Sequence, residues 1–409
     1  MLVGGSVEHA HVAVLEDGDL VEHYVTRKSR PSLVGNVYLG RVQNVLPGME
    51  AAFVDIGQPR NAVLYVGELI GEEELEGGQQ PPRIEQVLRS GQQILVQVTK
   101  DPMGTKGARL TTMVSLAGRY LVLVPNGTGY GISKKLPDDE RSRLRDIARS
   151  IRPDGYSLIV RTAAQGAQAD ELQRDLDRLV RLWQEIDKRR GGKAPVEIYV
   201  EPDLVIRVVR DLFGKDFGKL VIEDPDVHDR VMKYIQAVDP DLAQHVELHQ
   251  GPLSMFDTYH VTEQLRKALE RKVWLPSGGY IVVDRTEALT VVDVNSGRYV
   301  SGKTLEDTVV KVNLEAAEEV VRQLRLRDIG GIIVIDFIDM LKAQNREEIL
   351  RAFREALAKD KTKTQVIGIS PLGLVEMTRK NVSEGLVEAL STPCPTCEGR
   401  GVVIEGDLA

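Results

Sequence analysis

Residues 280–297, YIVVDRTEALTVVDVNSG, contain two apolar runs joined by a short polar segment. Runs rich in β-branched residues and bounded by turn residues predict two strands, here in a hairpin-like pair. A helical pattern with a capping-box start follows at 304–327, and another apolar run, GIIVIDFID, occupies 331–339. The order strand, helix, strand implies a crossover connection and therefore a layered α/β sheet.

Two aspartates lie at or near the ends of these strands, Asp293 in VVDVNSG and Asp336 in IIVIDF. Active sites in α/β sheets gather at the carboxyl ends of strands, and two carboxylates brought together there repel unless a cation separates them. Mg²⁺ binds through one or two carboxylates and keeps several waters. Asn295 is placed to orient a carboxylate or a phosphate. The alternative is that both aspartates only cap the turn or helix that follows.

Five short apolar segments precede this region and predict a small barrel. They are NVYLGRVQNVL, EAAFVDIG, NAVLYVG, QQILVQVTK and ARLTTMVSL, at 36–46, 50–57, 61–67, 92–100 and 108–116. The strand count fits an OB-fold, and it also fits a small antiparallel barrel or meander without a ligand. Residues 9–25 predict a hairpin around EDGD, and helices are predicted at 136–151 and 169–192.

The composition is that of an ordinary globular protein, with 42% hydrophobic and 28% charged residues. No apolar run is long enough to span a membrane, and residues 1–18 lack the features of a signal peptide. The two cysteines argue against a disulfide framework, so we expect a cytoplasmic protein. The net charge of −8 argues only weakly against nucleic-acid binding, because basic clusters occur at 27–30, 188–190 and 322–327.

The two cysteines, Cys394 and Cys397, lie in STPCPTCEGRG near the C-terminus. Glycines follow the pair and prolines flank its first member, as in a zinc knuckle where backbone N–H groups approach thiolates. A redox centre is the alternative, but it calls for a thioredoxin-like βαβ context. Two cysteines supply half of a tetrahedral zinc site, so a second chain is an attractive source of the other half.

Taken together, several motifs resemble the ribonuclease E/G family. They are GMEAAFVDIG, KGARLTTMVSLAGRYLVL, LIVRTA, LPSGG, LTVVDVNSG, LRLRDIGGIIVIDFIDM and CPTCEGRG, in this order along essentially the whole chain. The resemblance implies a bacterial endoribonuclease that uses Mg²⁺, cuts A/U-rich single-stranded RNA and leaves a 5′-phosphate on the downstream product. RNA decay and the processing of ribosomal and transfer RNA are the implied roles.

The resemblance also implies an α/β multidomain layout. The expected parts are a discontinuous RNase H-like domain (1–31 and 207–268), an inserted OB-fold (32–112), a 5′-sensor (113–206), a DNase I-like catalytic domain (269–390) and a zinc link (391–409). Asp293 and Asp336 match the magnesium-binding aspartates of the family, and Asn295 matches the asparagine that helps to hold the site.

Substrate-binding positions follow from the same resemblance. In the 5′-monophosphate pocket, Arg161 and Thr162 match groups that contact the phosphate, and Gly118 and Val122 match positions against the terminal nucleotide. Where the family often has an arginine on a helix that supports this pocket, the sequence has Lys363, which keeps the charge and loses the guanidinium fork.

In the barrel, Phe53 matches a residue that stacks on a base and Lys106 one that meets phosphate. A second aromatic residue expected near position 63 is replaced by Val63, which removes a stacking platform. Cys394 and Cys397 match the zinc link, which implies one zinc ion shared by two chains and hence a homodimer. The family usually continues into a small dimerisation domain, through which a tetramer is a further expectation.

Two other classes of function stay open on the residues alone. An OB-fold RNA-binding scaffold or chaperone would bind RNA without Mg²⁺-dependent cleavage. A redox protein would cycle Cys394 and Cys397 through a disulfide without zinc. DNA is also a conceivable substrate, because stacking on single strands tolerates either sugar.

Overall fold

The computed structural model describes residues 1–6, 9–26, 32–69, 83–102, 106–286, 288–297, 304–360, 362–370, 373–380, 385–392, 394–397, 399 and 401–403. The chain forms two compact units. One contains residues 1–27, 219–228 and 247–409, and the other contains 28–218 and 229–246. Within the part of the chain just given, no helix is both long and apolar enough to cross a membrane.

The first unit contains a six-stranded sheet that carries both aspartates, in the order β16-β17-β18-β19-β21-β20. Its strands are β16 (Lys272–Trp274), β17 (Tyr280–Arg285), β18 (Leu289–Asn295), β19 (Gly331–Asp336), β20 (Thr364–Ile369) and β21 (Leu374–Arg379). The predicted hairpin is confirmed, since β17 and β18 pair antiparallel. The predicted crossover is confirmed too, since β18 pairs with a parallel β19.

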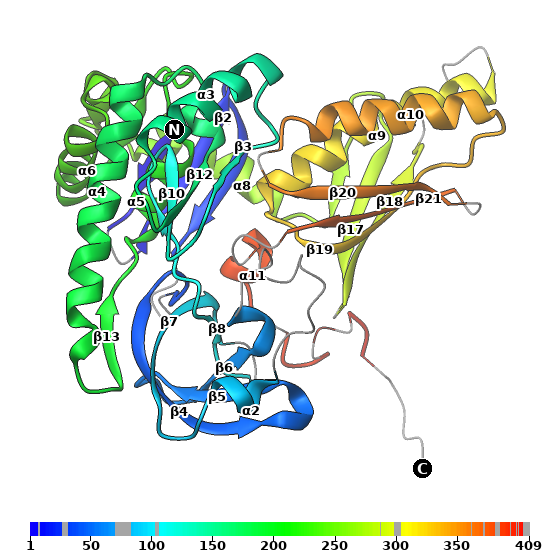
Figure 1. Cartoon of the computed structure of the whole chain (residues 1–409). Helices are drawn as coiled ribbons and strands as arrows, with labels where there is room; N and C mark the ends of the chain where they lie inside the picture. Colours follow the sequence, from blue (N-terminus) through cyan, green and yellow to red (C-terminus); the bar gives the residue numbers. More distant parts are fainter. Residues whose placement is uncertain are drawn as a thin grey trace. The chain divides into compact units, whose positions relative to one another are not determined.

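Helices α9 (Leu305–Leu326) and α10 (Ala343–Leu357) cover one face of this sheet (Figure 1). The predicted capping box begins α9, because the Thr304 side chain accepts a hydrogen bond from the Asp307 backbone N–H at 3.1 Å. Alternate residues of β18 and β19 are buried against the helices, among them Val292, Ile333 and Ile335. The residues between them therefore lie on the opposite face.

A second sheet in this unit joins segments that are far apart in the sequence, in the order β15-β14-β1-β2-β3. Its strands are β1 (Leu2–Gly4), β2 (His11–Glu16), β3 (Asp19–Val25), β14 (Leu220–Ile222) and β15 (Val246–Leu248). β1 pairs antiparallel with β2 and parallel with β14. The sheet that begins at the N-terminus is therefore completed by strands that come after a long insertion in the sequence. The RNase H-like assignment of these segments stays a prediction.

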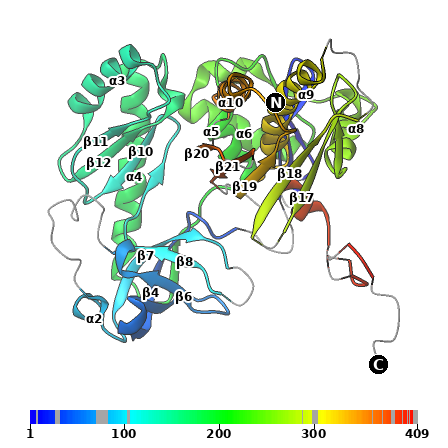
Figure 2. The same ribbon diagram turned by 90° about the vertical axis from the view of Figure 1, so that its right-hand side faces the viewer.

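The second unit contains a closed five-stranded barrel (Figure 2). Its strands are β4 (Val37–Leu46), β5 (Ala51–Asp55), β6 (Ala62–Tyr65), β7 (Gln93–Lys100) and β8 (Arg109–Thr111). They pair in the order β4-β5-β6-β8-β7, and β4 closes the barrel by pairing with β7. The parallel pairing of β6 with β8 and this closure fit an OB-like barrel.

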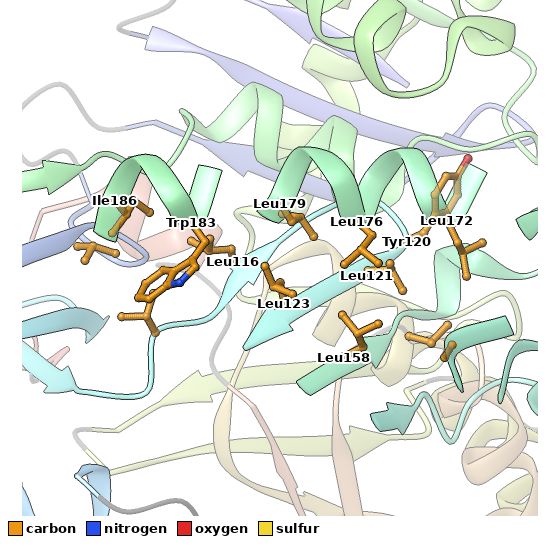
Figure 3. Packing of buried hydrophobic residues seen from close by; sticks show 14 of the residues in the cluster. Leu116, Tyr120, Leu121, Leu123, Leu158, Leu172, Leu176, Leu179, Trp183 and Ile186 are labelled. Carbon is orange, nitrogen blue, oxygen red and sulfur yellow. The ribbon is translucent and has the colours of Figure 1, made fainter. Parts of the chain in front are cut away.

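The same unit contains a four-stranded sheet, β11-β12-β10-β9. Its elements are β9 (Leu116–Ala117), β10 (Leu121–Pro125), β11 (Tyr130–Ile132), β12 (Tyr156–Val160), α3 (Asp138–Ile151) and α4 (Ala169–Lys188). Leu172, Leu176 and Leu179 recur at helical spacing in α4 and pack with Leu121 and Leu123 of β10 in one core (Figure 3). Both helices confirm the sequence-based prediction, apart from their ends.

The other α-helices and the one strand not yet named complete the two units. They are α2 (Ile84–Val87), β13 (Val196–Tyr199), α5 (Leu204–Leu212), α6 (Pro225–Val238), α7 (Met255–Thr258), α8 (Val261–Ala268) and α11 (Leu386–Leu390). α5 begins at Asp203, whose carboxylate accepts a hydrogen bond from the Ile206 N–H at 3.2 Å. This helix supplies Arg210 and Asp211 to the polar network described below.

Candidate functional site

The two predicted catalytic carboxylates face each other across neighbouring strands. Asp293 of β18 is directly opposite Asp336 of β19 in the parallel register, and both are exposed on the face away from the helices. Asn295 is two residues further along β18 and therefore projects from the same face. Its Nδ2 donates a hydrogen bond to Asp293 Oδ2 at 2.8 Å. The fold thus brings the three predicted side chains together, and their catalytic roles stay predictions.

A third carboxylate, Asp339, adds negative charge at this end of β19. The pKa of Asp336 lies above its ordinary value because burial disfavours the charged form and because Asp293 and Asp339 repel it. A bound cation would relieve this repulsion. Asp339 stands in the same IDFID motif, but the sequence pattern does not show how the chain turns after Asp336, so this carboxylate was not predicted.

Two glycine-containing turns hold the backbone around Asn295. A Cβ atom on Gly279 would lie 2.8 Å from the Asn295 carbonyl oxygen. Gly297 has φ of +61°, and a Cβ there would lie 2.5 Å from the Gly278 carbonyl oxygen. The LPSGG and NSG motifs are therefore two halves of one backbone contact that only glycine permits.

The donor set at this site suits Mg²⁺. Two carboxylates and an amide offer oxygen ligands on an exposed face, and Mg²⁺ usually binds through one or two carboxylates while keeping several waters. Over the parts of the chain that the structure describes, no group of three or more His, Cys, Asp or Glu side chains is arranged to hold a metal ion. Oxygen ligands of this kind suit Mg²⁺, whereas zinc and copper sites favour imidazole or thiolate ligands.

The predicted phosphate-contacting arginine lies at the end of β12. Arg161 Nη1 donates to the Gly118 carbonyl oxygen at 2.6 Å and forms an ion pair with Asp211 Oδ1 at 2.8 Å. Asp211 also accepts from Arg210 Nε at 2.8 Å. Burial raises the pKa of Asp211, but Arg161 and Arg210 more than offset this and hold the pKa below its usual value. A bound phosphate would therefore share Arg161 with an internal counter-ion.

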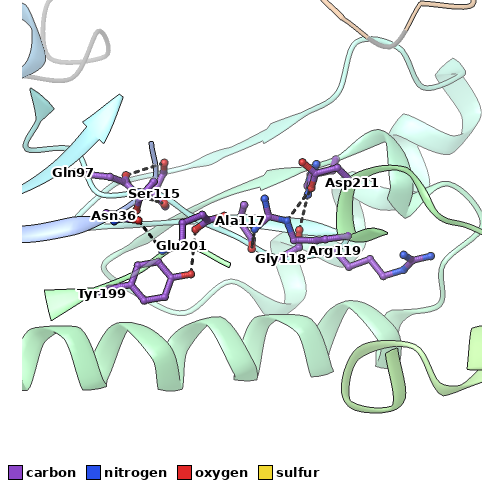
Figure 4. Close-up of polar contacts among 12 residues, drawn as sticks. Asn36, Gln97, Ser115, Ala117, Gly118, Arg119, Tyr199, Glu201 and Asp211 are labelled. Atoms are coloured by element: carbon purple, nitrogen blue, oxygen red, sulfur yellow. Dashed lines mark hydrogen bonds and ion pairs between the residues drawn. The ribbon is translucent and has the colours of Figure 1, made fainter. Parts of the chain in front are cut away.

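Gly118 and Asp211 belong to a longer polar network (Figure 4). Arg210 Nη1 donates to Glu201 Oε1 at 2.6 Å, and the Glu201 N–H donates to Asn36 Oδ1 at 2.9 Å. Asn36 immediately precedes β4 of the barrel. The network therefore connects the barrel to the arginine of the predicted pocket within the second unit.

A buried carboxylate shapes the turn that contains Gly118. Asp175 of α4 accepts hydrogen bonds from the backbone N–H groups of Arg119, Tyr120 and Leu121, at 3.3, 2.9 and 3.1 Å. A Cβ atom on Gly118 would lie 2.6 Å from Asp175 Oδ1 and closer still to Oδ2. Glycine is therefore needed at position 118 for space, so that its carbonyl oxygen can meet Arg161.

The other two predicted pocket residues border the same sheet. Val122 is half-buried and pairs with Ile159 on β12 and Ala117 on β9. Thr162 is exposed at the start of a short 3₁₀ helix, and its Oγ1 lies 2.8 Å from Ser133 Oγ. Val122 therefore offers an apolar surface and Thr162 offers a hydroxyl, and their roles in a pocket stay predictions.

Lys363 is not on a helix, so this part of the prediction is wrong. α10 ends at Leu357, and Lys363 immediately precedes β20, where its carbonyl oxygen accepts a hydrogen bond from the Lys380 N–H at 2.9 Å. The family resemblance placed Lys363 on a helix, but the chain enters an edge strand there. Lys363 is exposed and belongs to the first unit, whereas Arg161 belongs to the second.

The barrel surface contains a row of side chains across three strands. Phe53 of β5 is opposite Val63 of β6, which is opposite Arg109 of β8. Tyr65 lies two residues after Val63 and therefore on the same face, with the Arg109 guanidinium carbon 5.2 Å from its ring centroid. Tyr65 thus supplies an aromatic ring close to position 63, where the family resemblance implies an aromatic residue and this chain has valine. Lys106 is exposed just before β8.

The cysteines form a tight turn with free thiols. Cys394 is exposed and Cys397 is partly buried. Backbone N–H groups of Cys397 and Thr396 point at the Cys394 sulfur and lower its pKa, which favours the thiolate that zinc binds. With only these two thiols in the sequence, one chain supplies half of a tetrahedral site.

Comparison with known proteins decides the family. The Ribonuclease E/G family model matches residues 115–382. Ribonuclease G of Escherichia coli (strain K12) is 39% identical over 410 residues, which span 98% of this chain and 84% of that protein. This chain belongs to the ribonuclease E/G family. Ribonuclease E of Haemophilus influenzae is 40% identical over 405 residues, but the chain spans only 43% of its length.

Several side chains that contribute to these sites could not be predicted from the sequence. Asp175 and Asp211 hold the Gly118 turn and Arg161 through contacts between elements far apart in the chain. Both aspartates occupy ordinary positions on amphipathic helices, so no local motif marks them. Tyr65 could have been found, since alternation within β6 places it on the face of Val63.

Proposed function

We propose that this protein is a Mg²⁺-dependent endoribonuclease that cuts single-stranded RNA. Its active site would be formed by Asp293 and Asp336. That it is an endoribonuclease follows from its family. The proposal adds the metal, stimulation by a 5′-monophosphate, an A/U-rich preference, a cytoplasmic role in RNA decay, and a role in ribosomal and transfer RNA processing. The observation that carries it is the direct register of the two aspartates, with Asn295 bonded to one of them.

Each residue has a distinct task in this proposal. Asp293 and Asp336 would hold the metal, and the hydrogen bond from Asn295 fixes one rotamer of Asp293 beforehand. Bound Mg²⁺ supplies positive charge against the scissile phosphate and makes a coordinated water more acidic. The site lies on the face of the sheet opposite α9 and α10, so these helices leave it open to a single strand.

The test is cleavage of an A/U-rich single-stranded RNA with and without Mg²⁺. We expect internal cuts that need Mg²⁺ and a loss of at least about 100-fold in rate for Asp293→Asn, because the lost charge stabilisation is several kcal/mol. Asp284→Asn is the matched control, since Asp284 lies on the partner strand β17 and pairs with Arg271 at 2.6 Å. RNA binding without any cleavage would favour the scaffold function instead.

We extend the proposal to sensing of the RNA 5′ end by Arg161 and Thr162. The support is the cluster of Arg161, the Gly118 carbonyl and Asp211, whose contacts hold the guanidinium in one position. We expect a 5′-monophosphate RNA to be cut faster than its 5′-hydroxyl form, and Arg161→Ala to abolish the difference. Arg149→Ala, an exposed arginine on α3, is the control. Equal rates on both RNAs would remove the sensor and leave the nuclease.

We also propose that Cys394 and Cys397 bind one zinc ion together with the same residues of a second chain, forming a homodimer. The support is the pair of thiols in a turn whose N–H groups favour a thiolate. Cys397→Ser should lose zinc by metal analysis and shift the protein toward monomer by light scattering. A metal-free dimer of unchanged stability would refute this link, and a reversible disulfide would favour the redox function.

A further inference from the structure

The edge of the catalytic sheet carries an aromatic pair that none of the roles above uses. Trp274 of β16 is directly opposite Tyr280 of β17, and Tyr280 is directly opposite Asn295 of β18. Residues opposite one another on neighbouring strands project from the same face. Trp274 and Tyr280 therefore extend the face of Asp293 and Asn295 out to the edge strand.

A lysine lies between the two rings. The Lys272 ammonium nitrogen is 3.9 Å from the Trp274 ring centroid and 3.4 Å from the Tyr280 ring centroid. The two ring centroids are 5.4 Å apart, at an interplanar angle of 64°. Both distances are short for a cation–π contact, so the rings hold the positive charge at a defined place beside the acidic centre.

The exposure of Trp274 points to a ligand. The side chain is 62% exposed, whereas Trp183, the other tryptophan of the chain, is 8% exposed within a core. Tryptophan is highly buried on average, and it gains nothing in fold stability from its exposed ring surface. A ligand that stacks on the flat ring and carries a negative charge to pair with the neighbouring Lys272 ammonium would match this surface. A nucleotide has both features, a planar base and a phosphate.

We propose that Trp274 and Tyr280, with Lys272 between them, bind one nucleotide of the single-stranded RNA next to the bond that is cut. The base stacks on the exposed Trp274 ring, and its phosphate meets the Lys272 ammonium. Trp274 is two strands away from Asn295, which is about 10 Å at the usual strand spacing. This proposal rests on the proposed function, because it takes single-stranded RNA as the substrate.

The site would select for a single strand rather than for a base sequence. Every base has a π-face, so stacking on one ring accepts all four bases. A base paired in a duplex cannot stack on the ring, because both of its faces are already covered. The platform therefore gives the catalytic domain its own contact with the strand, in addition to those proposed for the barrel.

The first measurement is tryptophan fluorescence of Trp183→Phe protein, in which Trp274 is the remaining tryptophan. An A/U-rich single-stranded RNA is titrated in EDTA, so that the Mg²⁺-dependent reaction does not consume it. We expect saturable quenching by the single strand and none by the same sequence as a duplex. No quenching at RNA concentrations that saturate binding would overturn the proposal.

The second measurement compares substitutions at position 274. Trp274→Ala should weaken RNA binding and raise KM roughly 5- to 150-fold, the range for loss of one stacked base, with a smaller effect on kcat. Trp274→Phe should restore most of the loss, and Trp274→Leu should not. The control is Ile367→Ala, which removes another exposed apolar side chain on the opposite edge strand, β20, of the same sheet.

The outcomes separate this proposal from the nuclease proposal. Equal binding by the Phe and Leu variants would refute stacking, even if cleavage is normal. RNA-dependent quenching without any Mg²⁺-dependent cleavage would keep the platform and remove the nuclease proposal. Quenching that depends on protein concentration, and not on RNA, would identify the surface as a contact between two copies of the chain and overturn the proposal.

Discussion

Gly118→Ala should destabilise the second unit through a single contact. The new Cβ would lie 2.6 Å from Asp175 Oδ1 and 2.7 Å from Cγ, well inside van der Waals distance. Asp175 cannot retreat without losing three backbone hydrogen bonds. Overpacking of a tight site costs about 1–3 kcal/mol, and we expect a loss of about 2–3 kcal/mol in the free energy of unfolding. The proposed 5′-monophosphate preference should fall as well, because Arg161 bonds to the Gly118 carbonyl.

A double-mutant cycle isolates this contact. Asp175→Ala alone should cost about 3–5 kcal/mol, because it leaves buried N–H groups and Arg178 without their carboxylate. In that background Gly118→Ala should cost less than about 1 kcal/mol, because the oxygens that clash are gone. In an Asp175→Asn background the penalty should persist, because the amide has the same size.

Urea unfolding measures each step of the cycle. Trp183 reports on this unit because it lies in the core that α4 forms with β10, and Trp274→Phe removes the other tryptophan signal. A Gly118→Ala penalty that is equal in the Asp175→Ala and parent backgrounds would refute the steric account. A neutral Gly118→Ala substitution would refute it as well.

Three further predictions concern other residues. Burial, with His11 nearby, lowers the pKa of His23 to about 3, so unfolding takes up a proton between pH 6.5 and 3. The free energy of unfolding should therefore fall by about 1.5 kcal/mol between pH 6.5 and 5 by urea titration, and a His23→Gln protein with the same pH slope would contradict this. Tyr65→Ala should weaken RNA binding by about 1–3 kcal/mol in a filter-binding assay, and Val63→Phe should strengthen it; no change in either would remove the barrel face from the RNA path. If Mg²⁺ binds at Asp293 and Asp336 as proposed, Asp339→Asn should lower the raised pKa of Asp336, so calorimetric Mg²⁺ binding should persist to lower pH than in the parent; an unchanged pH dependence would show that Asp339 does not act on the proposed metal site.

Local pattern predicted much of the six-stranded sheet that carries Asp293 and Asp336. The hairpin of β17 and β18, the capping box of α9 and the crossover to β19 each depend on residues close together in sequence. Those three features are enough to bring Asp293 and Asp336 together at the carboxyl ends of β18 and β19. The strand count also predicted the barrel, although only the pairing of β4 with β7 shows that it is closed.

The contacts that tune the sites could not be predicted in this way. Asp175 meets its N–H partners more than 50 residues away in sequence, and Asp211 meets Arg161 at a similar separation. Lys363 was misplaced because its position came from the family resemblance and not from a local pattern. α10 ends at Leu357, and the chain then enters an edge strand. Trp274 reads as an ordinary strand residue until its exposure and its neighbours are seen.

The pairing of β1 with β14 also sets an order of events during synthesis. Leu2 of β1 cannot pair until its partner Val221, about 220 residues later, has been synthesised. Synthesis of that stretch takes about 10–45 s at usual rates of translation. In that interval the hairpin of β2 and β3 can form, while one edge of β1 stays open to pairing with other chains. The barrel and the sheet beside α4 are complete in sequence before β14 emerges. The nascent chain therefore folds its inserted half first and closes its N-terminal sheet afterwards.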